Sequence, residues 1–180
     1  LLNSRIITAT LRAALSITRL RFPEDLHKIE FKYKDENLYF KKINIPCNGH
    51  ELYNWAAGIE KAIYELLDSF LPVNPTSIEG HSELFSLEAL RPDSLLVEGR
   101  SLFDRILFML DDVHKLSAKQ REGLITHLLE KRTNASIWLS ERLEVLNNLK
   151  TNRGRDYEEL NLENYWKDRE SKFEKLLTSI

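Results

Sequence analysis

Five apolar residues in a row, Ile106–Leu110, place the strongest constraint on the fold of this chain. The run follows Arg105 and ends directly before Asp111, so charged residues bound it on both sides. A short apolar run without alternating polar positions is typical of a strand that is covered on both faces, as in a parallel sheet. Residues 104–110 are therefore predicted to form a buried strand.

Helix and strand signals alternate after this run. A capping-box pattern at Ser117 opens a helix that is predicted to end near Arg132. Residues 135–139 form a second short apolar strand, and residues 157–162 alternate as a third strand, followed by a helix over 163–178. This alternation predicts an α/β fold with a mainly parallel sheet and right-handed crossovers.

The first half of the chain carries signals for two helices and a hairpin. Apolar residues at three- and four-residue spacing predict helices over 1–20 and 51–71. Alternation over 27–34 and a second run over 38–45 predict a β-hairpin. Residues 83–100 show no clear pattern beyond a short helix interrupted by a proline.

The length of 180 residues corresponds to about one domain. We therefore expect residues 1–180 to form a single domain. In this domain, 1–100 supply a helix, a hairpin, a second helix and a loop, and 101–180 supply the apolar strands with their helices.

Polar residues at the ends of the two apolar strands carry the chemistry that the sequence suggests. Asp111 and Asp112 follow the first strand, at the carboxyl edge where ligands of open α/β sheets bind. Two carboxylates there can hold Mg²⁺, usually through water, and can orient a nucleophilic water. The second strand ends in Ser140-Glu141-Arg142, and the guanidinium of Arg142 suits phosphate oxygens. Simpler readings stay open: many buried strands end in an acid, and Arg142 could form a surface ion pair with Glu141.

The order and spacing of these pieces over residues 100–178 resemble the nucleotide-binding core of P-loop NTPases of the STAND type, including the NB-ARC branch, and of related AAA+ ATPases. Leu-Asp-Asp-Val-His at 110–114 resembles the end of a Walker B strand. The resemblance implies a three-layer P-loop NTPase-like core, helix-rich and with a mainly parallel sheet, that uses ATP and Mg²⁺.

The resemblance also implies a role for each matched residue. Asp111 would be the Mg²⁺-associated acid, and Asp112 the acid near the attacking water. Arg142 would be the sensor arginine that contacts the γ-phosphate, and Ser140 could contact the same water. Where the family has two threonines before this arginine, this chain has Ser140-Glu141.

ATPases of this kind act as cytoplasmic switch proteins that hydrolyse ATP and often assemble as homo-oligomers or with protein partners. Their settings include signalling, antiviral defence and replication initiation. Because the chain lacks a basic DNA-binding segment, the resemblance favours signalling or antiviral defence here.

One element of the family pattern is missing. No G-x-x-x-x-G-K-[ST] motif occurs in the chain, so no loop is present to cradle the β- and γ-phosphates. We expect the P-loop and its strand, which in this family lies beside the sensor strand, to be encoded upstream of Leu1. The alternative is a non-catalytic α/β interaction domain derived from a P-loop NTPase, which binds a protein or nucleic-acid partner.

Composition excludes several other classes. The net charge of −2 provides no global basic field for nucleic acid, and no apolar run approaches the roughly 18 residues of a membrane span. A single cysteine, Cys47, excludes an internal disulfide and favours a reducing compartment such as the cytoplasm. The five histidines show no zinc-ligand spacing with Cys47.

Overall fold

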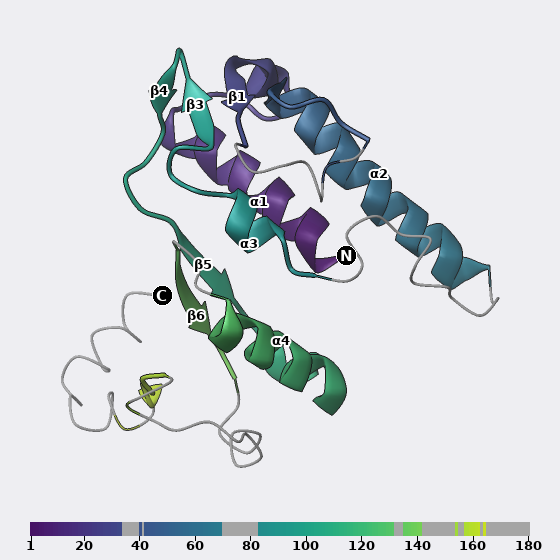
Figure 1. Cartoon of the computed structure of the whole chain (residues 1–180), viewed down its shortest axis with the longest axis vertical. Helices are drawn as coiled ribbons and strands as arrows, with labels where there is room; N and C mark the ends of the chain where they lie inside the picture. Colours follow the sequence, from purple (N-terminus) through teal and green to yellow (C-terminus); the bar gives the residue numbers. More distant parts are fainter. Residues whose placement is uncertain are drawn as a thin grey trace, which may run out of the picture. The chain divides into compact units, whose positions relative to one another are not determined.

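The computed structural model describes residues 1–33, 40, 42–69, 83–131, 135–141, 154, 157–162 and 164. The chain divides into two compact units, Leu1–Ser140 and Glu141–Ile180. The helices and strands named below belong to the first unit, which combines helices with two separate β-sheets (Figure 1).

Two amphipathic helices, α1 (Leu2–Ile17) and α2 (Gly49–Asp68), pack against each other and form the helical part of the core (Figure 1). The apolar stripe of α1 is buried and consists of Ile6, Ile7, Leu11, Ala14 and Leu15. α2 begins at a capping box, in which Glu51 N–H donates to Asn48 Oδ1 and Asn48 N–H donates to Glu51 Oε2, each at 2.9 Å. Both predicted helices are confirmed.

The start of α2 lies tightly against the turn of 3₁₀ helix η1 (Glu24–Lys28). A Cβ at Gly49 would lie 2.6 Å from the carbonyl oxygen of Leu26, so only glycine fits at this contact. Burial along α2 is confined to its first turns. Leu52 and Ala56 are buried, whereas Leu67 near the other end is 56% exposed.

A four-stranded antiparallel sheet in the order β2-β1-β3-β4 packs against α2. Its strands are β1 (Ile29–Phe31), β2 (Cys47–Asn48), β3 (Leu95–Val97) and β4 (Arg100–Ser101).

The predicted hairpin differs from this sheet in its second strand. β1 pairs antiparallel with β2, where Phe31 lies opposite Cys47, and with β3. The described residues of the segment 38–45 form no strand. Residues 42–46 form turns and bends instead of a strand, while Phe40 is fully buried in the core. Residues 34–39 and 41 lie outside the described part.

A second hairpin joins β3 to β4 and was not predicted. The short helix expected in this region is α3 (Ser86–Ala89). The hairpin follows it, with Val97 opposite Arg100 across a two-residue turn. Both turn residues, Glu98 (φ 52°) and Gly99 (φ 76°), adopt the left-handed conformation that such tight turns require. A Glu-Gly pair after an apolar triplet was the signal available in the sequence.

The predicted strand, helix and strand after residue 104 are confirmed. β5 (Leu107–Leu110) and β6 (Ser136–Leu139) pair in parallel, with Met109 opposite Trp138. α4 (Ala118–Glu130) lies between them in the chain (Figure 1). Its N-terminus carries the expected capping box between Ser117 and Gln120. The short turn η3 (Val113–Lys115) follows β5.

The prediction that both faces of β5 are covered is wrong for the described part of the chain. Ile106 and Phe108 point into the main hydrophobic core and are 9% and 8% exposed. Leu107 and Met109 point the other way and are 46% and 67% exposed. An uninterrupted apolar run shows that the side chains on both faces of a strand are apolar. It does not show that other parts of the protein cover both faces.

The fold is a mixture of helices and strands, and the expected mainly parallel sheet is not what the described residues form. The larger sheet is antiparallel, and parallel pairing is confined to β5 and β6. The third predicted strand, 157–162, has only an isolated bridge at Tyr157, and Leu160 and Leu162 remain 65% and 59% exposed. Alternation alone did not produce a strand because no sheet pairs with this segment in the described part.

The predicted helix over 163–178 lies outside the described residues apart from Asn164. In the described part of the chain, no helix has both the length and the apolar character needed to cross a membrane.

Candidate functional site

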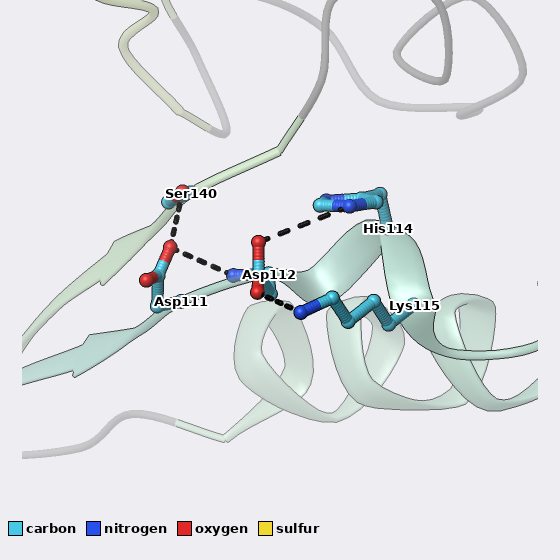
Figure 2. A network of polar contacts seen from close by, with 5 residues as sticks. All are labelled: Asp111, Asp112, His114, Lys115 and Ser140. Carbon is cyan, nitrogen blue, oxygen red and sulfur yellow. Dashed lines mark hydrogen bonds and ion pairs between the residues drawn. The ribbon is translucent and has the colours of Figure 1, made fainter.

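Asp111 and Ser140 meet at the carboxyl edge of the parallel sheet. Asp111 directly follows β5 and Ser140 directly follows β6, so parallel pairing brings the two side chains to the same edge (Figure 2). The Ser140 hydroxyl donates a hydrogen bond of 2.7 Å to Oδ1 of Asp111. This contact joins residues that are 29 positions apart in the sequence.

Backbone hydrogen bonds extend the pairing of the strands past this edge. The N–H of Ser140 donates to the carbonyl of Leu110 at 2.9 Å, and the N–H of Val113 donates to the carbonyl of Ser140 at 3.0 Å. The position of Ser140 is therefore set by the main chain on both sides. Its hydroxyl meets Asp111 as a consequence of the sheet register.

The two carboxylate oxygens of Asp111 differ: Oδ1 accepts hydrogen bonds from the protein, and Oδ2 accepts none within the described part. Oδ1 accepts both the Ser140 hydroxyl and the N–H of Asp112, the latter at 2.8 Å. Within the described part, no hydrogen bond or ion pair reaches Oδ2, and the residue is exposed. Two donors on one oxygen orient the carboxylate, so that the other oxygen is available to a cation or to water.

Asp112 adopts a left-handed backbone conformation (φ 57°), which turns its side chain away from the Asp111–Ser140 pair (Figure 2). Its Oδ2 contacts the ammonium of Lys115, and its Oδ1 lies 3.8 Å from Nε2 of His114. The two neighbouring carboxylates thus serve different contacts. A left-handed conformation costs a non-glycine residue roughly 1 kcal/mol, which the turn into η3 must offset.

The contact between Asp112 and Lys115 is an exposed one. The side chains are 45% and 69% exposed, and exposed ion pairs contribute about 0–1 kcal/mol. The ion pair with Lys115 therefore contributes little free energy to holding the carboxylate of Asp112 in place. Sequence reasoning missed Lys115, although its spacing of three residues from Asp112 on a short helical turn was the available signal.

His114 lies beside Asp112 with its side chain only 14% exposed. Its Nδ1 is buried and has no hydrogen-bond partner in the part of the chain that the structure describes.

The structure brings together three of the four residues singled out in the sequence. Asp111 and Ser140 are in direct contact, and Asp112 adjoins them but faces Lys115. Arg142, the expected sensor arginine, lies outside the described residues.

Cys47 in β2 is buried, and its thiol is expected to react slowly in the folded protein. Burial, with a smaller contribution from the charge of Glu51, raises the pKa of its thiol to about 12 from 9.0. At pH 8 this lowers the thiolate fraction about a thousandfold, and the thiolate is the form that reacts. We expect iodoacetamide to modify the native protein far more slowly than the unfolded protein, as followed by mass spectrometry. Equal rates in the two states would contradict this.

The described residues contain no group of three or more His, Cys, Asp or Glu side chains that could hold a metal ion. A cation at Asp111 would therefore complete its coordination with water or with a bound ligand. This donor set fits Mg²⁺, which binds proteins through one or two carboxylates and keeps several waters.

Comparisons with protein-family models, with curated protein sequences and with solved structures give no match. The chemistry of this site therefore rests on its own geometry.

Proposed function

We propose that this chain is part of an ATP-binding and ATP-hydrolysing switch protein of the STAND or AAA+ type, with a three-layer P-loop core. The observation that carries the proposal is the contact between Asp111 and Ser140, at the carboxyl ends of two parallel strands. The connection of these strands through α4 is the strand–helix–strand order in which open α/β folds bind ligands at that edge.

Asp111 is the residue proposed to hold Mg²⁺, through its open Oδ2 and bound water. Bound Mg²⁺ would neutralise charge on the phosphates of ATP. Ser140 keeps the Asp111 carboxylate oriented by occupying Oδ1, and its hydroxyl oxygen retains lone pairs that can accept a hydrogen bond from water.

Asp112 is proposed to orient the attacking water after its carboxylate leaves Lys115. The exposure of this ion pair supports such a movement, since an exposed ion pair contributes little free energy. Arg142 is proposed to contact the γ-phosphate with its planar guanidinium.

The loop that would cradle the phosphates is proposed to be encoded ahead of Leu1. Signalling or antiviral defence is the proposed biological setting.

Calorimetric titration with ATP, with and without Mg²⁺, tests the proposal on the protein prepared with whatever sequence its gene encodes ahead of Leu1. We expect ATP to bind, and Asp111→Ala to weaken Mg²⁺-dependent binding about 10- to 100-fold, as for loss of one contact to a charged group. Asp104→Ala is the matched control, because this exposed acid precedes β5 instead of following it. Its binding should equal that of the wild type.

A non-catalytic interaction domain is the second candidate, and the exposed apolar residues of the parallel sheet favour it. Leu107, Met109 and Trp138 are 46%, 67% and 60% exposed on β5 and β6. Absence of ATP binding in the titration, together with identical behaviour of wild type and Asp111→Ala, would support this candidate and contradict the first.

A further inference from the structure

In the described part of the chain, one face of the β5–β6 sheet is apolar at its centre and open. Side chains alternate between the faces of a strand, so every second residue lies on this side. By this alternation, the open sheet face carries Leu107 and Met109 of β5 with the flanking Arg105 and Asp111, and Ser136 and Trp138 of β6 with the following Ser140.

The apolar part of the open sheet face is continuous. Met109 and Trp138 are direct neighbours in the parallel register, and Leu107 is the next residue of β5 on this side. Their exposed fractions are 67%, 60% and 46%. Parallel strands are normally covered on both faces, and contiguous exposed apolar patches mark interaction sites.

The charged residues of this face are placed so that two copies of the face could pair with opposite charges in contact. Arg105 stands at one end of the apolar stripe and Asp111 at the other. The guanidinium of Arg105 has no ion-pair partner among the described residues, and Oδ2 of Asp111 is open.

A two-fold axis perpendicular to β5, passing near Phe108, brings matching residues of two copies together. Arg105 of each copy then faces Asp111 of the other, and Leu107 of each copy faces Met109 of the other. Trp138 lies beside Met109 and extends the apolar centre of both faces. Because Trp138 is level with Met109 and Ser136 with Leu107, Trp138 of each copy lies opposite Ser136 of the other. Along β5, apolar residues meet apolar residues and opposite charges meet, as an isologous interface requires.

We propose that the open sheet face binds a second copy of this chain, face to face and with the β5 strands antiparallel. The apolar centre is small, so the affinity is expected to be weak, with a Kd on the order of 10–100 µM. Arg105 of the second copy and the Mg²⁺ of the proposed function would compete for Oδ2 of Asp111. Association is therefore measured in EDTA without nucleotide, where failure of one proposal leaves the other intact.

Sedimentation velocity over about 1–500 µM protein, a range set around the expected Kd, is the first test. Wild type should shift from monomer to dimer across this range. Met109→Glu should weaken association at least tenfold, because it places an unpaired charge at the centre of the interface. Ile17→Glu is the matched control. Ile17 is 65% exposed on α1, outside the open sheet face, so this variant should associate like wild type.

Charge exchange tests the antiparallel arrangement. Arg105→Asp places two carboxylates opposite each other in a homodimer, and Asp111→Arg places two guanidinium groups opposite each other. Each variant alone should dimerise about tenfold more weakly than wild type. An equimolar mixture of the two should recover association, because both contacts in the mixed dimer then join opposite charges.

Three outcomes would overturn the proposal. The wild type could stay monomeric over the whole range, Met109→Glu could associate like wild type, or the mixture could remain as weak as its components. A heterologous partner, such as a helix of another protein, predicts the first of these outcomes. Circular dichroism of each variant shows whether it folds, and Met109→Glu tests the face without altering Asp111 or its contact with Ser140.

Discussion

Under the proposed function, Asp112→Asn is expected to slow ATP hydrolysis by at least about 100-fold while leaving ATP affinity within about twofold. Asparagine keeps the shape of the side chain but removes the negative charge that would orient and polarise the attacking water. Binding should persist, because Asp111 and its contact with Ser140 are unchanged. Phosphate release measures hydrolysis, and calorimetry measures binding, on the protein with the sequence encoded ahead of Leu1.

Asp104→Asn is the control for this variant, because it makes the same chemical change at an exposed position before β5. It should hydrolyse ATP at the wild-type rate. If Asp112→Asn retained that rate as well, Asp112 would have no part in the reaction, and its contacts with Lys115 and His114 would serve the structure of the turn. Loss of binding together with hydrolysis would instead indicate that Asp112 supports the fold of the turn.

Phe40→Ala is expected to lower the free energy of unfolding by about 3–5 kcal/mol, the usual cost of removing a buried phenyl ring. Phe40 is 1% exposed and stands at the centre of an aromatic cluster. Its ring centroid lies 5.1–5.6 Å from those of Phe31, Tyr33, Trp55 and Phe85. Small domains are stable by only about 5–15 kcal/mol, so this single change removes a large share. Urea denaturation followed by circular dichroism measures it.

Leu67→Ala provides the comparison for Phe40→Ala. Leu67 is 56% exposed near the end of α2, and surface truncations usually change stability by about 0.5 kcal/mol or less. A loss below about 1 kcal/mol for Phe40→Ala would show that the aromatic cluster collapses around the vacancy or contributes little to the core.

Local patterns predicted the helices well. The apolar stripes of α1 and α2 and the capping box of α4 involve residues a few positions apart, so their effect does not depend on distant parts of the chain. The same reasoning explains the success with β5 and β6, whose apolar residues contrast sharply with their flanking charges.

Strand pairing was harder to predict, because it depends on residues that are far apart. The partner of β1 is β2 on one side and β3 on the other, and nothing near Ile29–Phe31 specifies Leu95–Val97. The segment 42–46 has apolar residues like a strand but forms turns, with Phe40 used as a core side chain instead.

Sequence alone determined which residues could act at the site: two acids after one apolar strand and a serine after the next. Tertiary structure decided how they are used. The parallel register placed the Ser140 hydroxyl against Asp111, and the left-handed turn directed Asp112 to Lys115. It also decided that one face of β5 is buried and the other open. The physical reason is that composition and periodicity set the chemical character of a side chain, whereas its neighbours depend on contacts between distant segments.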